Sequence, residues 1–262
     1  MTKKNIVTLV IILFFFACGK KDEFPSVNYT DDQQKATLKV EGHEGAVDIK
    51  LNSINIVNPT DSIFAARLNS EIDSFLLSKY YINGTFKSFD ELKDTLYQEY
   101  KDLVTEFPDV PYGYSLEREV KVETDTLGIF SISKFEMTFL GGAHPNSSLF
   151  YSNYSTTNNS VITLEELIID NGIEKLTQIA EQIFRKEKDL ASDADLNEAG
   201  YWFENGQFRL NDNFLIQKEG LLFYYNNYEI TAYAVGPTEL FIPYNDFNNL
   251  IKEDSPLRVF LH

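Results

Sequence analysis

A histidine in a glycine-containing turn is the first candidate for chemistry in this chain. His144 follows Gly141-Gly142-Ala143, and glycines can present backbone N–H groups to a developing negative charge, as an oxyanion hole does. A catalytic histidine would also need a nucleophile, and Ser147 and Ser148 are the nearest hydroxyls. Turn histidines more often hydrogen-bond a neighbouring loop. We therefore assign no catalytic residue, and an uncharacterised hydrolase is the least favoured alternative.

A tyrosine-rich segment about 80 residues further on is the better candidate for recognition. Tyr224, Tyr225, Tyr228 and Tyr233 surround Glu229 in this segment. Exposed tyrosines offer rigid amphipathic surface to a sugar ring or a protein, and the carboxylate of Glu229 could engage a cation or a hydroxyl. The alternative is half-buried packing within a strand. We take these five residues, together with His144, as candidate binding residues.

An acidic loop has part of the spacing of a calcium site. Asp193, Asp195 and Asn197 occupy positions 1, 3 and 5 of such a loop, and Glu204 occupies position 12. Position 6 is Glu198, where the sharp turn needs glycine. These four residues are thus a weak calcium candidate, and we expect no metal and no cofactor. The carboxylates of Glu165, Glu166 and Glu229 could form a glycosidase pair, but the sequence supplies no distance between them.

The N-terminus has the features of an export signal. Lys3-Lys4 precedes an apolar run from Ile6 to Phe16, which at eleven residues is short of the ~20 needed to span a bilayer. Cys18, the only cysteine, stands where a lipoprotein signal peptidase leaves the residue to be acylated. We expect a signal peptide over 1–17 and a tether over 18–34. A simply cleaved signal is the alternative, because Phe15 and Phe16 are bulky for a lipobox.

The charge balance limits the classes of partner. The chain carries 40 acidic and 23 basic residues, a net charge of −17, and removing residues 1–17 with their two lysines makes it −19. This argues against nucleic acid and anionic membrane surfaces, and it is compatible with a cationic protein partner. With 43% hydrophobic residues and no possible internal disulfide, the fold must depend on its core. We expect membrane association through a lipid anchor only.

Alternating and helical patterns predict an α+β fold, with antiparallel sheets and three main helices packed on one face. The expected strands are 36–40 and 46–57, 114–124 and 127–140, 149–154, and then 214–217, 221–225 and 240–242. The expected helices are 60–76 with Thr60 as N-cap, 89–107 with a capping box of Ser88 and Glu91, and 173–184, with shorter turns at 163–167 and 244–251. We expect an N-terminal part at 35–140 and a C-terminal part at 141–262, forming one compact unit.

Four of these segments carry a resemblance to a known family. They are Gly141–His144, Thr163–Leu167, Phe223–Ile230 and Phe241–Tyr244. Together they resemble the RsiV-like extracytoplasmic domain family, the bacterial domain-of-unknown-function family 3298, with an N-terminal part similar to family 4163. The likeness runs from roughly residue 35 to 251.

The resemblance implies a non-enzymatic binding module of the cell envelope, exported and facing the periplasm or the surface. In the anti-sigma factor of this family the domain binds lysozyme as a signal, and a related domain accompanies a peptidoglycan deacetylase. A lysozyme-like cationic enzyme is therefore the first expected ligand, and peptidoglycan or another glycan is the second. Only Met1-Thr2 and two lysines precede the apolar run, so we do not expect sigma-factor binding.

Overall fold

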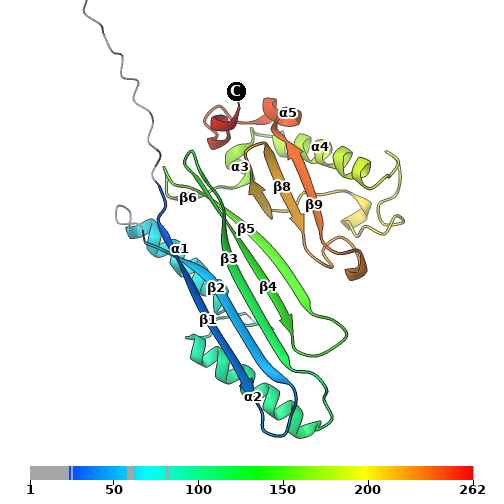
Figure 1. Cartoon of the computed structure of the whole chain (residues 1–262). Coiled ribbons are helices and arrows are strands. Elements are labelled where there is room, and N and C mark those ends of the chain that lie inside the picture. The colour runs from blue at the N-terminus through cyan, green and yellow to red at the C-terminus, as the bar shows by residue number, and fades with distance from the viewer. Residues whose placement is uncertain (1–23, 25, 58–61, 81–82, 262) are drawn as a thin grey trace, which may run out of the picture.

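The computed structural model describes residues 24, 26–57, 62–80 and 83–261. It contains a six-stranded sheet and a three-stranded sheet with helices packed against them (Figure 1). The larger sheet has the spatial order β1 (Tyr29–Lys39), β2 (Ala46–Ile56), β3 (Tyr114–Thr126), β4 (Ile129–Phe139), β5 (Asn146–Ser155) and β6 (Ser160–Val161). The smaller sheet has the order β7 (Phe214–Ile216), β8 (Gly220–Tyr225) and β9 (Thr238–Pro243). The predicted mixture of helices and sheets is confirmed.

One strand pair differs from the prediction of antiparallel sheets. β2 and β3 run parallel, whereas the other neighbouring strands are antiparallel. Parallel neighbours need a long crossover connection, and the segment between them contains α1 (Ser62–Leu76) and α2 (Phe89–Glu106). These two helices return the chain to the end of the sheet where β2 begins, so β3 starts in the same direction as β2.

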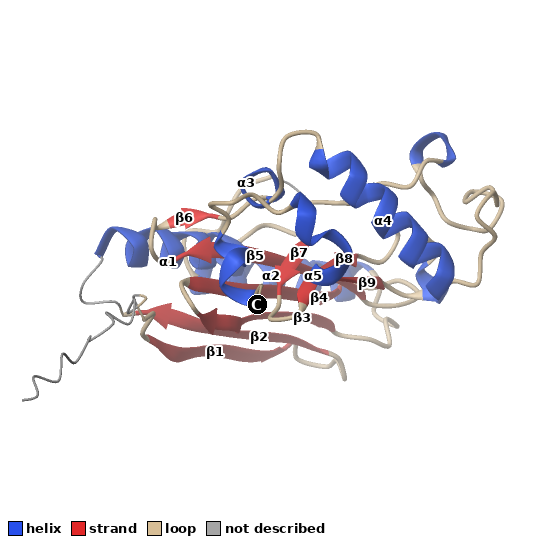
Figure 2. Cartoon of the chain, turned by 90° about the horizontal axis from the view of Figure 1, so that it is seen from above, coloured by secondary structure: helices blue, strands red, loops and turns tan. Residues whose placement is uncertain are grey.

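The helices do not form one layer on one sheet. Among the described residues, three helices are long, namely α1, α2 and α4 (Gly172–Glu187), and two are short, namely α3 (Leu164–Leu167) and α5 (Tyr244–Phe247). Leu68 of α1 and Leu96 of α2 lie in the core under the larger sheet, whereas Phe184 of α4 lies in the core under the smaller sheet. Figure 2 shows α4 beside the smaller sheet, away from α1. Each sheet buries its own apolar face, so each has its own helix layer.

Capping residues mark the helix starts that the structure describes. Ser88 accepts the backbone N–H of Glu91 at 3.2 Å, and Glu91 accepts the N–H of Lys87, so α2 begins where predicted. Thr163 and Glu166 form the predicted capping box of α3. Thr60 lies outside the described residues. Single 3-10 turns lie at η1 (Glu204–Gly206), η2 (Tyr233–Val235), η3 (Asn248–Leu250) and η4 (Pro256–Phe260).

The first strand begins earlier than predicted. β1 pairs with β2 from Tyr29 onward, and Val27 is already buried, so the tether predicted over 18–34 is too long. The side chains from Tyr29 to Lys35 are all exposed. This half of β1 is held by backbone hydrogen bonds at the edge of the sheet, and it carries no apolar alternation by which the sequence could reveal it.

Asparagine amides join the smaller sheet to the free edge of β5. Tyr151 N donates to Asn213 Oδ1 at 2.8 Å, and Asn213 Nδ2 donates to the carbonyl of Leu149 at 2.8 Å. Leu149 N in turn donates to Asn226 Oδ1 at 2.7 Å. β6 pairs only with the last two residues of β5, so these amides satisfy backbone groups that would otherwise have no strand partner.

A third asparagine reaches from β5 to the backbone of β7. Asn153 is 3% exposed; its Nδ2 donates to the carbonyl of Phe214 at 2.7 Å, and its Oδ1 accepts from Ile216 N at 3.0 Å and from the Ser131 hydroxyl at 2.8 Å. β5 and β6, which follow the boundary predicted between residues 140 and 141, complete the larger sheet. The two sheets are therefore connected by buried polar contacts as well as by the chain.

Candidate functional site

The turn that carries His144 joins β4 to β5. Gly141 and Gly142 have φ angles of +97° and +104°, which residues with a Cβ adopt only with strain. At Gly141 a Cβ would also lie 2.7 Å from the hydroxyl of Tyr112. Glycine is therefore needed here for the hairpin to close, and the turn places the imidazole of His144 outside the sheet.

The loop between β8 and β9 lies against this turn. Tyr228 has φ +65°, and Glu229 fixes the loop by accepting hydrogen bonds from Asn226 N and Asn211 Nδ2, each at 2.7 Å. Asn227 Nδ2 donates to the hydroxyl of Ser147 at 3.1 Å, which holds the loop to the start of β5. Glu229 is thus engaged in shaping the loop.

These two segments bring three of the predicted binding residues together. The rings of His144 and Tyr233 stack with centroids 3.7 Å apart and planes 12° apart. Tyr228 lies next to both rings, with its hydroxyl 3.3 Å from His144 Nε2. We call His144, Tyr228 and Tyr233 the tip cluster.

Hydrogen bonds to one carbonyl fix the orientation of the tip cluster. His144 Nδ1 and the Tyr233 hydroxyl lie 2.9 and 3.0 Å from the Pro145 oxygen, and only a donor can bond to a carbonyl. We therefore assign the proton to Nδ1, which leaves Nε2 to accept from the Tyr228 hydroxyl. His144 is exposed, Tyr228 is 50% exposed and Tyr233 is half-buried, so the cluster presents ring surface to solvent.

The other two predicted tyrosines lie elsewhere. Tyr225 is 1% exposed and its hydroxyl donates to the Arg209 carbonyl at 2.7 Å, so its assignment to a binding surface is wrong. Strand alternation points Tyr225 into the core, while its neighbour Tyr224 is half-buried on the opposite face. Tyr224 packs edge-on against Tyr151 at 6.2 Å, and burial raises the pKa of its phenol.

The geometry does not assemble a nucleophile and a base. In the described part of the chain, neither Ser147 nor Ser148 hydrogen-bonds His144, and the imidazole contacts only aromatic rings and the Pro145 carbonyl. What the tip cluster offers chemically is a flat ring surface with phenol and imidazole groups at its border. Such a surface suits binding by stacking.

The residues of the calcium-like loop are used in other contacts. Asp195 Oδ1 accepts the N–H groups of Asn197 and Glu198, Asn197 Oδ1 accepts from Phe203 N, and Glu204 pairs with Arg209. Asp193 is exposed. Within residues 24–261, excluding the undescribed positions, no group of three or more His, Cys, Asp or Glu side chains is placed to hold a metal ion.

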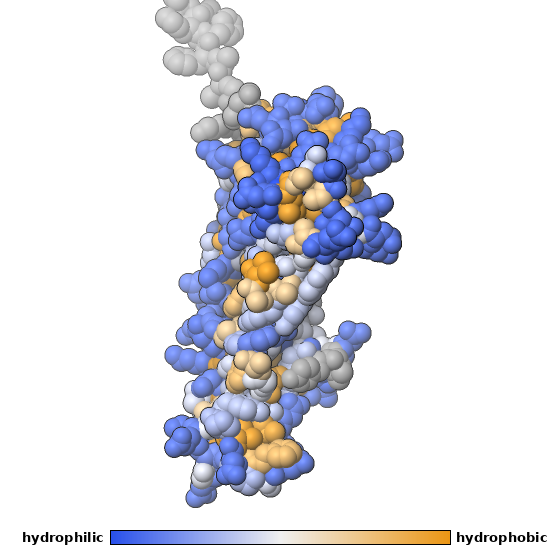
Figure 3. Space-filling view, turned by 90° about the vertical axis from the view of Figure 1, so that its right-hand side faces the viewer, coloured by the Kyte–Doolittle hydropathy of each residue, from blue (hydrophilic) through white to orange (hydrophobic). Residues whose placement is uncertain are grey.

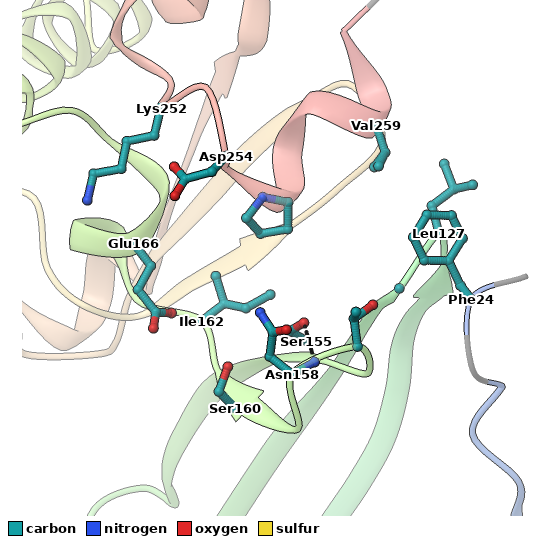
Figure 4. Close-up of a pocket in the computed structure, with 13 residues that line it drawn as sticks. Phe24, Leu127, Ser155, Asn158, Ser160, Ile162, Glu166, Lys252, Asp254 and Val259 are labelled. Atoms are coloured by element: carbon teal, nitrogen blue, oxygen red, sulfur yellow. Dashed lines mark hydrogen bonds between the residues drawn. The ribbon is translucent and has the colours of Figure 1, made fainter. Parts of the chain in front are cut away.

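At the other end of the larger sheet lies a cavity of about 380 Å³. Figure 4 shows Phe24, Leu127 and Val259 on one side of it and the polar groups of Glu166, Asn158 and Ser160 on the other. The sequence pattern had not indicated this cavity, because its walls come from the N-terminus, two turns, α3 and the C-terminus. Cys18 and the apolar run lie outside the described residues, and no described helix is long and apolar enough to span a membrane.

Two family models match different parts of the chain, and the tip cluster has residues in both matches. Residues 40–147 match the family model for the deacetylase PdaC, and residues 165–245 match that for a protein of unknown function, DUF3298. His144 lies in the first match, and Tyr228 and Tyr233 lie in the second. No curated protein matches the chain.

Two solved structures have the same fold. A DUF3298 family member from Bacteroides fragilis covers 90% of this chain and 97% of its own, with 22% identity and a TM-score of 0.74. A DUF3298 family protein from Pseudomonas aeruginosa PAO1 covers 87% and 96%, with 17% identity and a TM-score of 0.64. The chain therefore has the fold of these DUF3298 proteins. In this chain the segment that matches the PdaC model supplies strands of the larger sheet, and the segment that matches the DUF3298 model supplies the smaller sheet.

Proposed function

We propose that this protein is a non-enzymatic, lipid-anchored module of the bacterial cell envelope that binds a cationic protein, a lysozyme-like enzyme, through the tip cluster. The observation that carries the proposal is the tip cluster itself. Its rings come from segments 84 and more residues apart, and hydrogen bonds hold them in place before any ligand arrives. Preorganised, exposed tyrosines bind at a low entropic cost, which is why they are frequent at recognition sites.

The position of the tip cluster supports the proposal. Phe24 lies near the β3–β4 turn, at one end of the larger sheet, and the tip cluster follows the opposite end of β4. The eleven residues of β4 separate these ends by roughly 35 Å at ~3.4 Å per residue. An anchor at Cys18 would thus direct the tip cluster away from the membrane.

The charge of the chain supports a cationic partner. Without residues 1–17 the net charge is −19, which accelerates encounter with a basic protein, and salt weakens this attraction. The likeness to the RsiV-like family suggests lysozyme as that protein.

A glycan is the second candidate ligand. The name of the PdaC family model points to a deacetylase, and the resemblance described above connects such domains with peptidoglycan. The rings of His144 and Tyr233 already stack on each other, and sugars stack on aromatic faces of the same kind. Sugar stacking is weakly dependent on salt, so salt separates the two candidates.

Calorimetric titration tests the proposal. The chain without its first 21 residues is titrated with hen-type lysozyme and with soluble peptidoglycan fragments, each at low and physiological salt. We expect micromolar or tighter binding of lysozyme that weakens with salt, and at least a tenfold loss of affinity in Tyr228→Ala, about 1.4 kcal/mol. Tyr29→Ala is the matched control, because Tyr29 is 41% exposed at the opposite end of the sheet.

Each outcome has a defined meaning. Heat from the fragments alone would move the assignment to the glycan. Lysozyme binding that is equally strong in Tyr228→Ala would exclude the tip cluster as the contact. The absence of heat with both ligands would refute both forms of the proposal.

A further inference from the structure

Apolar side chains are exposed at the end of the domain opposite the tip cluster. β2 and β3 run parallel, so Ile56 and Thr126 end these strands at the same end of the sheet, where β5 and β6 also meet. We call this the anchor end. The exposed apolar residues there, with their exposed fractions, are Phe24 (38%), Val57 (44%), Ile63 (80%), Leu127 (42%) and Val161 (41%).

The chain enters the domain at the anchor end. Figure 1 shows the start of β1 at the same end of the larger sheet as the β3–β4 turn, and Figure 3 shows scattered apolar groups among polar ones at the upper end of the molecule. Phe24 packs on the turn, since a Cβ at Gly128 would lie 2.6 Å from its ring. Five different segments contribute to the apolar surface, so no single amphipathic element explains it.

One of these residues, Leu127, has a backbone conformation that is unfavourable for leucine. Leu127 has φ +51° and Gly128 has φ +83°, the signs of a two-residue type I′ turn between Thr126 and Ile129. Asparagine or glycine suits the first position, whereas leucine in the left-handed region costs roughly 1 kcal/mol. The turn therefore holds an apolar side chain in solvent where a polar residue would be more stable.

The length of the N-terminal segment limits what can cover this surface. Five residues lie between Cys18 and Phe24, which makes six steps along the chain, and each step spans at most ~3.5 Å. The anchor end can therefore lie no more than about 20 Å from a lipid attached to Cys18. The longer tether expected from the sequence, ending at residue 34, would have allowed roughly three times that distance. The early start of β1 thus brings the anchor end close to the bilayer.

We propose that the anchor end rests on the surface of the lipid bilayer, with Ile63 and Leu127 inserted among the headgroups. This inference rests on the lipid anchor of the proposed function. Apolar side chains at an interface gain by leaving water, and an acyl anchor supplies the attachment that so small a patch cannot supply alone. The lipid surface that fits is zwitterionic, because the acidic chain is repelled by anionic lipids. In this orientation the tip cluster points outward.

Depth-dependent fluorescence quenching of the full lipidated chain tests the proposal. Acylation consumes Cys18, so Ile63→Cys provides one thiol for an environment-sensitive dye, and Val235→Cys, 62% exposed in η2 beside the tip cluster, is the matched control. The proteins are reconstituted in phosphatidylcholine vesicles with and without nitroxide-labelled lipid, at about one protein per vesicle. We expect the nitroxide lipid to reduce the emission at position 63 at least twofold and to leave position 235 unchanged.

Three results would overturn the proposal. Protein that fails to float with vesicles would refute the anchor and this inference together, whereas floating protein with no quenching at position 63 would refute the inference alone. An emission change at position 63 that appears only at many proteins per vesicle, and that is the same without nitroxide lipid, would identify a second copy as the occupant. In Leu127→Asn, which suits the turn better, quenching at position 63 should fall while thermal stability does not fall; unchanged quenching would exclude Leu127 from the contact.

Discussion

Replacing Asn153 by alanine should destabilise the whole domain by about 3–5 kcal/mol. The amide of Asn153 is buried and makes three hydrogen bonds, two of them to the backbone of β7. Alanine leaves the Phe214 carbonyl and the Ile216 N–H without a partner, at roughly 1–3 kcal/mol each, and removes the acceptor of the Ser131 hydroxyl. A loss of this size is a large part of the 5–15 kcal/mol typical of a domain.

Urea unfolding followed by tyrosine fluorescence and by circular dichroism measures this loss. Asn158→Ala is the control, because Asn158 is exposed in the same segment and contributes only its backbone N–H to a hydrogen bond, so the change should be within about 0.5 kcal/mol. If the amides join the two sheets into one cooperative unit, both probes should give one transition in the wild type. A loss below 1 kcal/mol in Asn153→Ala would refute the reasoning that these contacts hold the sheets together.

Three further predictions concern single side chains. Burial, with Glu123 and other charges nearby, raises the pKa of Tyr151 to about 12. The stability that depends on its neutral phenol is therefore fully present below pH 10 and is lost as the pH rises through 12. Tyr151→Phe should flatten this part of a pH–stability profile. Arg118 is fully buried and hydrogen-bonded to Glu136, so Glu136→Ala leaves a buried charge without its partner and should cost about 3–5 kcal/mol in urea unfolding. Arg118→Met removes the buried charge itself and should cost less; a larger loss in Arg118→Met than in Glu136→Ala would contradict this reasoning. Leu127→Asn should raise thermal stability by about 1 kcal/mol through relief of the left-handed leucine, and a fall in melting temperature would exclude that strain.

Local patterns in the sequence were sufficient to predict most of the helices and strands. The stripe of Leu92, Leu96 and Tyr100 and the cap at Ser88 predicted α2, because helical periodicity and capping act within a few residues. The same holds for the β3–β4 hairpin and for α4. The exposed half of β1 was not predicted, because its pairing uses backbone groups, which every residue has. The parallel pairing of β2 and β3 was not predicted, because packing between distant segments decides the path of a crossover connection.

The sequence by itself determined that His144 stands in a glycine turn and that a tyrosine-rich segment follows, and it predicted both as candidates for binding. It could not separate Tyr225 from Tyr228, since two tyrosines in one segment have the same chemistry until a sheet buries one face. Only the tertiary structure decided that His144, Tyr228 and Tyr233 meet, and that an apolar end with a strained Leu127 lies opposite them. Such sites depend on contacts between segments about 80 residues apart, whose distances no local pattern encodes.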